Sequence, residues 1–577
     1  MSATKTIHVD SVAEAYLTLL AERGIEYLFA NGGTDFAPIN EALAAIAAKG
    51  TTPALKVVAV AHENVATAMA HGYYLLTGRP QMVMLHVSVG TANGINALID
   101  AARDHVPMIF TAGRNPLTEQ GMKGSRDTGI HWAQEMFDQG SMVREFCKWD
   151  YELRNGEQLE AVIDRAIEIA TTEPCGPVYL SLPREVMSAA MTEFTFTATP
   201  RRAFGTSPGP TPEQIAGAAD LIAAAERPLI LARENTRVAA NATALAAFAE
   251  RFAVPIVEYR SLANSVPTDH PMLLGFDPGP HLADADLILV IETDVPWIPT
   301  VHGNPPDHCK IVHIGVDPLF SRVPIRSFPC DLAVTGAPRT VLPQLTAALG
   351  NRIAEPRLAA RRARIAAVQQ RNREGAATSL ARAKIASPLQ PAWASHCISQ
   401  AKDDDTIVVN EYSLILRHAH FAKPRTYLGT PTAGGLGWGV GAAIGAKLAA
   451  PDRLVIATLG DGAYMFGNPT AGHQAARALG LPILFIVFNN AMWEEVEASA
   501  LRVFPDGYAA RANRMPVGSL GPVARYEHMM KIYDGYGECV DTAEALPGAL
   551  ERALHAVRVE KRQALLNLIV GPRGGAP

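Results

Sequence analysis

Short runs of β-branched and other apolar residues alternate with alanine-rich stretches of helical periodicity along the whole chain. This alternation is typical of βαβ units, in which helices cover a parallel sheet. The expected strands fall into three groups, each large enough to form a sheet of its own. They are 26–30, 57–61, 82–87, 108–112 and 176–183 in the first group, 228–232, 255–259, 286–294 and 311–317 in the second, and 406–411, 453–461, 482–490 and 564–570 in the third.

The three groups predict three tandem doubly wound α/β domains with mainly parallel sheets, over residues 1–190, 205–350 and 380–577. Between the first two domains, residues 191–212 are rich in Thr, Pro and Gly and are expected to form a linker. A basic, alanine-rich helix over 357–375 is expected to lead into the third domain.

Two helix starts can be located from side chains that cap backbone N–H groups. Ser11 and Glu14 have the spacing of a capping box, and Gly24 is expected to close that helix. Thr211 and Gln214 repeat the spacing, with a proline between them at a favourable first position of a helix. Helices are therefore predicted to begin just after Ser11 and Thr211.

The bulk composition is that of a soluble globular protein, with 577 residues of which 48% are hydrophobic and 19% charged. The formal charge of −6 gives no reason to expect nucleic acid as a partner. Apolar runs stay shorter than a membrane span needs, and the first residues lack a signal-peptide core. The six cysteines are scattered, so neither a disulfide framework nor a structural zinc site is predicted. We expect a cytoplasmic protein without membrane or nucleic-acid partners.

Polar residues end two neighbouring strands of the third group in an unusual way. Gly460-Asp461-Gly462 closes one strand and Asn489-Asn490 closes the next, with 26 residues between Gly462 and Asn489 that hold a single expected helix. Ligands of parallel sheets lie at such carboxyl ends. Carboxylate and amide oxygens suit Mg²⁺, and glycines let backbone N–H groups approach a phosphate. Either fragment alone would more often be a turn; together they predict a magnesium–diphosphate site.

This pair of motifs resembles that of thiamin diphosphate enzymes, specifically the acetolactate synthase, pyruvate oxidase and 2-keto-acid decarboxylase superfamily. The resemblance covers nearly the whole chain and implies pyrimidine-binding, Rossmann-like central and diphosphate-binding domains, in that order. It implies a homodimer or homotetramer with the active site between subunits. The Mg²⁺ ligands it implies are Asp461, Asn490 and the carbonyl of Met492, and the cofactor contacts in this region are Gly460, Asp461, Gly462, Ala463 and Asn490.

The first domain is expected to supply the other half of the cofactor site. Glu63 follows a buried-looking strand and resembles the family's activating acid, which exchanges a proton with the aminopyrimidine ring. Alone, it would more often be a helix N-terminal charge; beside the magnesium–diphosphate motif, the activating acid is favoured. Further cofactor contacts implied by the resemblance are Asn93, the carbonyl of Gly434, the apolar wedge Leu436, and Glu411 with Ser413 at another strand end.

Three residues of the first domain are expected to face the substrate. The resemblance places Thr34 and Asp35 near the thiazolium ring. The segment 85–98 resembles the benzoylformate decarboxylase version of its loop and puts His86 at a catalytic position, where an imidazole could shuttle a proton. The alternative is a buried histidine that is satisfied by backbone groups.

Residues after Asn490 favour a coenzyme A thioester as the substrate, in place of the 2-keto acid that the 85–98 loop suggests. Glu494 and Glu495 fall where one carboxylate could accept the proton of a substrate hydroxyl, although at least one of them is expected on an exposed helix face. Clustered arginines suit the phosphates of coenzyme A, or else form a solvated surface. They are Arg502, Arg511, Arg514 and Arg525, followed by Lys561, Arg562 and Arg573.

The leading hypothesis is therefore a carbon–carbon lyase that depends on thiamin diphosphate and Mg²⁺ and cleaves a 2-hydroxyacyl-CoA to an aldehyde or ketone plus formyl-CoA. The alternatives are a 2-keto-acid decarboxylase like the benzoylformate enzyme, an acetolactate synthase-like carboligase, and a catalytically silent relative. ADP is a candidate ligand of the central domain, where Asp294 and Asp317 end two strands. FAD is not predicted, because no Gly-x-Gly-x-x-Gly opens either turn.

Overall fold

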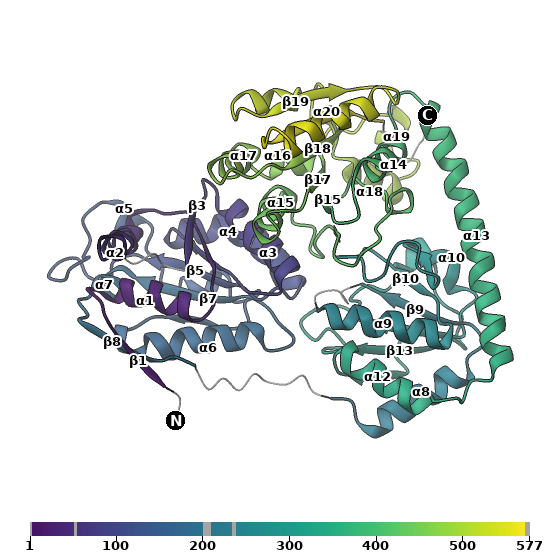
Figure 1. Cartoon of the computed structure of the whole chain (residues 1–577), viewed down its shortest axis with the longest axis horizontal. Coiled ribbons are helices and arrows are strands. Elements are labelled where there is room, and N and C mark those ends of the chain that lie inside the picture. Colours follow the sequence, from purple (N-terminus) through teal and green to yellow (C-terminus); the bar gives the residue numbers. More distant parts are fainter. Residues whose placement is uncertain (1–2, 51–54, 200–208, 234–237, 572–577) are drawn as a thin grey trace. The chain divides into compact units, whose positions relative to one another are not determined.

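The computed structural model describes residues 3–50, 55–199, 209–233 and 238–571. The chain divides into two compact units (Figure 1). The first contains Met1–Thr206, Pro431–Ala450 and Gly467–Leu479; the second contains Ser207–Thr430, Pro451–Phe466 and Gly480–Pro577. Arg573 lies outside the described residues.

Three six-stranded sheets form the framework, and every strand pair within them is parallel. The predicted α/β class with parallel sheets is confirmed. In the first unit the order is β3 (Lys56–Ala59), β2 (Tyr27–Ala30), β4 (Met82–Leu85), β5 (Ile109–Arg114), β7 (Val178–Pro183), β6 (Asp150–Glu152). In the second unit the central sheet has the order β11 (Leu273–Gly275), β10 (Ile256–Glu258), β9 (Pro228–Ala232), β12 (Leu287–Ile291), β13 (Lys310–Gly315), β14 (Leu332–Thr335). The other sheet of that unit has the order β16 (Tyr427–Leu428), β15 (Ile407–Glu411), β17 (Val455–Gly460), β18 (Leu484–Asn489), β20 (Ala564–Ile569), β19 (Tyr536–Val540).

Helices cover these sheets, which explains why the inner strands are apolar on both faces. All six residues of β18 are buried, as expected for a parallel strand between two helical layers. The helices of the first unit are α1 (Val12–Glu22), α2 (Ala37–Ala48), α3 (Glu63–Thr77), α4 (Val87–Arg103), α5 (Ile130–Ala133), α6 (Leu159–Thr171), α7 (Arg184–Ser188), α15 (Trp438–Ala449) and α17 (Pro469–Ala478).

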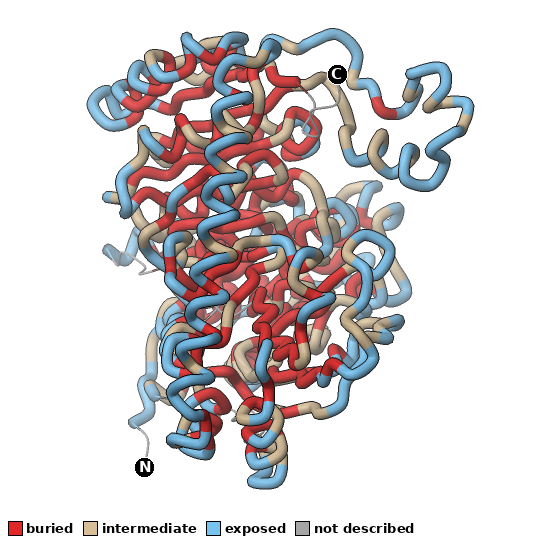
Figure 2. The backbone as a smooth tube through the Cα atoms, turned by 90° about the vertical axis from the view of Figure 1, so that its right-hand side faces the viewer, coloured by how far each residue is buried: buried red, intermediate tan, exposed pale blue. Residues whose placement is uncertain are grey.

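The second unit contains the longest described helix, α13 (Glu355–Ile385), much of which is exposed along its length (Figure 2). The capping box predicted at Thr211 is confirmed. The Thr211 side chain accepts from the Gln214 N–H, and the Gln214 side chain accepts from the Thr211 N–H. The other helices of this unit are α8 (Pro212–Ala224), α9 (Ala239–Phe252), α10 (Gly279–Leu282), α11 (Pro299–His302), α12 (Pro338–Leu349), α14 (Pro391–Ala401), α16 (Asp461–Phe466), α18 (Glu494–Val503), α19 (Tyr508–Ala512) and α20 (Leu546–Arg558). No helix among the described residues combines the length and the apolar character that crossing a bilayer requires.

The structure corrects two local predictions. Part of the expected linker 191–212 is a strand, β8 (Glu193–Thr197), which pairs antiparallel with β1 (Thr4–His8) because Phe194 and Phe196 alternate inward and are buried. The stretch between β17 and β18 holds two helices, not one. The break lies at Gly467-Asn468, where Asn468 has a left-handed φ of 50° and a proline starts α17.

Glycines allow α3 and α15 to pack backbone against backbone within the first unit. A Cβ at Gly72 would lie 2.2 Å from the Ala442 carbonyl oxygen, and one at Gly445 would lie 2.0 Å from the Met69 carbonyl oxygen. Neither carbonyl can rotate away as a flexible side chain would. This contact therefore depends on the glycines.

Gly445→Ala is expected to lower the midpoint of thermal unfolding, because overpacking of this kind costs ~1–3 kcal/mol. Gly375→Ala in α13 is the matched control, since its Cβ would meet nothing within 4 Å. There the change should be neutral or raise stability by up to ~1 kcal/mol. Differential scanning calorimetry of both variants checks this; equal midpoints would show that the helices can separate without loss.

Candidate active site

The carboxyl ends of β17 and β18 bring Asp461 and Asn490 to the same edge of the sheet, as predicted. The two strands pair directly, with Gly460 opposite Phe488. Asp461 is the first residue of α16 and is only 2% exposed. Its Oδ2 accepts a hydrogen bond of 2.7 Å from the N–H of Ala491, which follows Asn490 in the chain. The carboxylate thus holds the loop that presents the asparagine.

The Asp461 carboxylate is buried among backbone donors. Burial raises the pKa of Asp461 to about 6, although backbone hydrogen bonds, among them those from Gly462 and Ala491, act in the opposite direction. A cation at this point would offset that cost. No three His, Cys, Asp or Glu side chains gather as a metal site among the described residues. A cation here would therefore rely on Asp461 together with the amide oxygen of Asn490 and the carbonyl of Met492, a hard oxygen set suited to Mg²⁺.

The loop after Asn490 is fixed by pairing with residues 518–520. The Trp493 N–H donates to the Gly518 carbonyl at 2.6 Å, and the Leu520 N–H donates to the Ala491 carbonyl at 2.8 Å. Ala491 has a positive φ of 56°, an uncommon conformation for alanine. A Cβ at Gly462 would lie 2.4 Å from the Trp493 ring, so the second glycine of the motif is required for this fit. Ala463 follows on the same buried helix start.

Glu411 and Ser413 lie beside this edge, at the end of β15. Glu411 is opposite Leu459 of β17, and both polar residues are buried. Asn410 shapes the turn: its Oδ1 accepts from the N–H groups of Ser413 and Leu414, at 3.1 and 2.8 Å. The Ser413 hydroxyl donates to the Glu411 carbonyl at 3.3 Å. Their predicted position at a strand end is therefore observed, while their contact with a cofactor stays a prediction.

In the first unit, Glu63 opens α3 and receives a hydrogen bond from α4. The Nδ2 of Asn93 donates to Glu63 Oε2 at 3.2 Å, and Glu63 is 9% exposed. One turn later on α4, Asn96 donates to the carbonyl of Leu436 at 3.0 Å. Gly434, in the same loop, has a positive φ of 66°. Glu63 and the 434–436 loop thus both contact side chains of α4, while their contacts with a cofactor stay a prediction.

His86 forms a close pair with Asp35. Its Nδ1 donates to Asp35 Oδ1 at 2.5 Å, and Asp35 is 4% exposed. Asp35 raises the pKa of His86 through this hydrogen bond, against the opposing effect of burial. Two glycines make room for the pair: a Cβ at Gly33 would lie 2.2 Å from His86 Nδ1, and one at Gly113 would lie 1.8 Å from Asp35 Oδ2. The alternative of a histidine satisfied only by backbone groups is therefore wrong.

Gln134 contacts the other nitrogen of His86 and was not predicted. Its Nε2 lies 3.3 Å from His86 Nε2, which suits a neutral ring that accepts there. The Oε1 of Gln134 is buried without a hydrogen-bond partner. Turning the amide by 180° would present this oxygen to a protonated His86. Gln134 is thus able to match either charge state of the ring.

His131 is a second residue that the sequence did not reveal. It is buried, and its Nδ1 accepts from the Asp127 N–H at 3.3 Å, so the proton of the neutral ring lies on Nε2. Nε2 is 3.0 Å from the Thr34 hydroxyl and therefore donates to it. Burial lowers the pKa of His131, which favours this neutral form. His131 thus holds Thr34 in place, while the position of Thr34 near a thiazolium ring stays a prediction.

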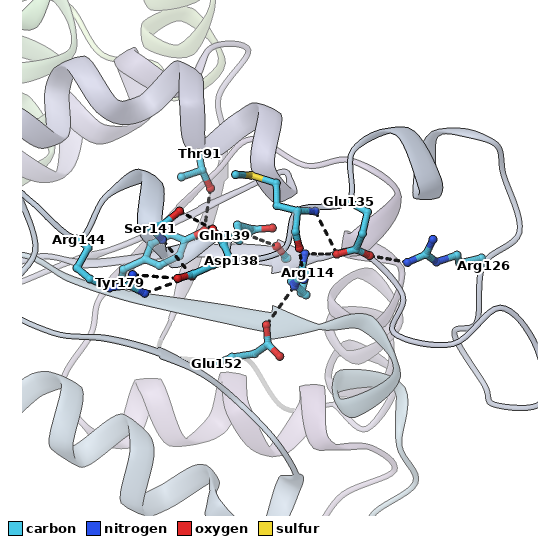
Figure 3. Close-up of polar contacts among 12 residues, drawn as sticks. Thr91, Arg114, Arg126, Glu135, Asp138, Gln139, Ser141, Arg144, Glu152 and Tyr179 are labelled. Carbon is cyan, nitrogen blue, oxygen red and sulfur yellow. Dashed lines mark hydrogen bonds and ion pairs between the residues drawn. The ribbon is translucent and has the colours of Figure 1, made fainter.

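A polar network anchors the segment that carries these two residues (Figure 3). Glu135 forms ion pairs with Arg114 and Arg126, and Arg114 also pairs with Glu152 at 3.1 Å. Next along the segment, Gln139 donates to the hydroxyl of Tyr179 at 2.8 Å, and Thr91 contacts the same hydroxyl. Asp138 completes the network by accepting hydrogen bonds from the Ser141 N–H and the Arg144 guanidinium group. Contacts with Arg114 of β5 and Tyr179 of β7 therefore hold in place the segment that carries His131 and Gln134.

Glu494 and Glu495 have different surroundings. Glu494 is partly buried, and its Oε2 accepts from Asn490 Nδ2 at 3.3 Å. Glu495 is exposed and lies 3.6 Å from Arg502. Of the two glutamates, only Glu494 contacts Asn490 among the described residues.

The arginines after Asn490 make local contacts. Arg511 donates to the Asp506 carbonyl at 2.7 Å and stacks on Tyr508, while Arg525 pairs with Glu527 at 2.5 Å. Arg514 is exposed. Among the described residues, these guanidinium groups therefore do not converge on a common binding site.

In the central sheet, the two carboxylates considered for ADP have protein partners. Asp294 pairs with Arg233 at 2.8 Å, and Asp317 accepts from the N–H and hydroxyl of Ser321. ADP binding stays a prediction.

Comparison with known proteins identifies the family. Residues 10–142 match the thiamine pyrophosphate enzyme N-terminal TPP binding domain, residues 215–345 the central domain and residues 411–567 the C-terminal TPP binding domain. A probable 2-ketoarginine decarboxylase, AruI, of Pseudomonas aeruginosa is 27% identical over 510 residues, with 85% of this chain and 83% of the relative covered. Benzoylformate decarboxylase of the same organism is 27% identical over 577 residues, with 96% and 97% covered.

A solved structure agrees on the fold. The thiamine diphosphate-dependent 4-hydroxybenzoylformate decarboxylase of Rhodococcus jostii RHA1 superposes with a TM-score of 0.77 at 22% identity, covering 97% of this chain and 99% of the other. The three domains, in the order that the sequence predicted, show that the chain belongs to the family of thiamine pyrophosphate-dependent enzymes.

Proposed function

We propose that this enzyme is a 2-keto-acid decarboxylase. The observation that carries the proposal is the Asp35–His86 pair, which is close, largely buried and located on the unit that also holds Glu63 and Asn93. A histidine whose pKa is raised by a carboxylate offers, when protonated, a donor to the carboxylate or keto oxygen of a 2-keto acid. The two relatives named above are also decarboxylases, which supports the same reaction class.

Each residue has a defined task in this proposal. Thiamine pyrophosphate, when bound, would supply the carbon nucleophile and the electron sink that decarboxylation of a 2-keto acid needs. Glu63 holds and exchanges a proton at its carboxyl group, and Asn93 orients that group. His86 positions the substrate and moves a proton at Nε2, since Asp35 occupies Nδ1. Thr34, oriented by His131, offers a hydroxyl on the substrate side.

We further propose that Mg²⁺ is held by Asp461, Asn490 and the Met492 carbonyl, where it would bind the diphosphate of the cofactor. The chemistry of the three oxygen donors and the burial of Asp461 support this assignment. The proposed assembly is a homodimer or homotetramer in which Glu63 of one copy serves the cofactor held by another. Analytical ultracentrifugation tests the assembly directly, because a monomeric active species would contradict it.

The 2-hydroxyacyl-CoA lyase hypothesis has weaker support. It depended on Glu494 and Glu495 as a catalytic pair and on arginines that would bind coenzyme A. Glu495 is exposed and pairs with Arg502, and Arg525 pairs with Glu527. These contacts leave no specific feature that favours coenzyme A over a smaller acid.

A substrate panel tests the proposal. The purified enzyme with thiamine pyrophosphate and Mg²⁺ is offered benzoylformate, 4-hydroxybenzoylformate, 2-ketoarginine and pyruvate, and carbon dioxide is measured. Release from at least one of benzoylformate, 4-hydroxybenzoylformate and 2-ketoarginine is expected. Acetolactate as the only product from pyruvate would assign the enzyme to the carboligases instead. Calorimetric binding of coenzyme A, with formyl-CoA as a product, would restore the lyase hypothesis.

Asp35→Asn is expected to lower the pKa of His86, because it removes the hydrogen-bonded carboxylate that raises it. At a given pH fewer enzyme molecules then hold a charged His86, so the limb of the pH–rate profile due to His86 should move to lower pH and kcat should fall by ~10–100-fold. Titration of the His86 ring proton by NMR measures the shift. Asp127→Asn, an exposed substitution next to His131, is the control; an unmoved His86 in Asp35→Asn would contradict the role of the pair.

A further inference from the structure

A cavity of about 190 Å³ lies at the amino-terminal edge of the central sheet, between the strand starts and α13. Its wall includes Arg227 and Pro228 at the start of β9, Pro255 before β10 and Ala285 before β12. Ligands of open parallel sheets usually lie at the opposite edge, where Asp294 and Asp317 are found. This cavity is therefore separate from the edge considered for ADP and from the residues assigned to catalysis.

The polar lining is strongly cationic. Four arginines reach the cavity, against one carboxylate, Asp284. The four are Arg227, Arg361, Arg364 and Arg371. Among the described residues, no carboxylate lies within ion-pair distance of any of these guanidinium groups.

Arg361 is the buried member of the group and is 2% exposed. Its Nη atoms donate to the carbonyls of Phe252, Ile222 and Ala225, at 2.8, 3.1 and 2.5 Å. These are neutral acceptors, so its charge is not balanced by a carboxylate, and its Nε is buried without a hydrogen-bond partner. Burial lowers the pKa of Arg361 to about 10, which reflects the cost of holding this charge away from water.

The α13 helix brings three of the arginines together. Arg361, Arg364 and Arg371 recur at helical spacing, and the apolar residues Ile365 and Val368 lie between them on the same wall. Apart from His281 and Asn372, the remainder of the wall is apolar, from Leu229 and Leu274 among others. The site thus joins a charged part with a small apolar part.

We propose that this cavity binds a small phosphate monoester, with its phosphate on the arginines and its carbon skeleton against the apolar wall. A phosphate dianion has several oxygens that can accept from more than one guanidinium group, whereas a carboxylate matches one such fork. Two negative charges also fit the excess of arginines over Asp284. The occupied site would tie α13 to the strand starts of β9 and β12.

Isothermal titration of the holoenzyme, saturated with thiamine pyrophosphate and Mg²⁺, tests the site with glycerol 3-phosphate, inorganic phosphate and acetate as probes. The double variant Arg364→Ala, Arg371→Ala removes two exposed cationic groups of the cavity. The control is Arg362→Ala, Arg373→Ala, which removes the same charge from the same helix at positions that bind Glu355 and Gln370 instead. Unchanged thermal unfolding of both variants shows that the fold is kept.

We expect glycerol 3-phosphate to bind the wild-type holoenzyme and its Kd to rise at least tenfold in the cavity variant but not in the control. Weaker binding of inorganic phosphate at the same site would support the apolar wall as part of the site. The proposal is overturned if glycerol 3-phosphate does not bind at 10 mM (about 2.7 kcal/mol of binding free energy). It is also overturned if acetate binds as tightly, or if both double variants lose affinity equally.

Discussion

Glu63→Gln is expected to lower kcat by ~10²–10⁴-fold, the usual contribution of a positioned general acid–base group. Glutamine has nearly the same shape, and its Oε1 can still accept the hydrogen bond that Asn93 donates to Glu63. The amide, however, carries no proton that it can exchange with the cofactor ring. Binding of thiamine pyrophosphate should therefore be largely kept while the reaction slows.

Two measurements separate these effects. Calorimetry gives the Kd of the cofactor, and NMR follows the exchange of its C2 proton with deuterium in the absence of substrate. Glu41→Gln is the control, because Glu41 is an exposed acid on α2 of the same unit. An exchange rate in Glu63→Gln equal to that of the wild type would contradict the role assigned to Glu63, whatever the substrate of the enzyme proves to be.

The framework was predictable because apolar runs mark inner parallel strands. All the expected strands occur, with ends that differ by a few residues. The strands that the pattern missed are short or lie at sheet edges, such as β6, β11, β14, β16 and β19. An edge strand has one neighbour and a partly exposed face, so it lacks a continuous apolar run. The β1–β8 pair was not predicted, because residues 191–212 are rich in Thr and Pro, a composition typical of a linker.

The positions of the candidate cofactor residues at strand ends were predictable where a motif and a strand end coincide. Asp461 and Asn490 follow strands that do pair, and Glu63 does meet Asn93. The two-helix connection between β17 and β18 was missed, although Asn468 followed by a proline is a recognisable break. A single helix was predicted to contain these residues.

Residues around the substrate were less predictable, because their contacts join segments far apart in the chain. His131 and Gln134 come from the connection after β5, about fifty to a hundred residues from Thr34 and His86, which they contact. No local spacing encodes such a pairing. Gly33 and Gly113 carried a partial signal, since glycine next to a strand end often permits close approach. Only the structure shows that these two glycines make room for the Asp35–His86 pair.

Asp461→Asn is expected to weaken the binding of thiamine pyrophosphate with Mg²⁺ by about 30-fold or more, since removing one partner of a buried charge pair costs ~2–5 kcal/mol. The amide keeps the shape of the side chain. It has one acceptor oxygen, however, where Asp461 uses its two oxygens to accept from the N–H groups of Gly462 and Ala491. It loses the negative charge on which a divalent cation depends. Titration of the apoenzyme with cofactor at saturating Mg²⁺ measures the change, and Asp452→Asn, an exposed residue before the same strand, is the control.

Stability without the cofactor should respond differently in the same variant. The pKa of Asp461 is raised to about 6 from a usual value of 3.8, so the unfolded chain ionises first and the charged carboxylate disfavours the folded state above pH 6. Asparagine removes this penalty, which offsets the loss of one hydrogen-bond acceptor, and the cofactor-free midpoint of thermal unfolding at pH 7 should change little. Adding Mg²⁺ and thiamine pyrophosphate should then raise the midpoint of the wild type but not that of Asp461→Asn. An equal rise in both proteins would show that the cation is held elsewhere.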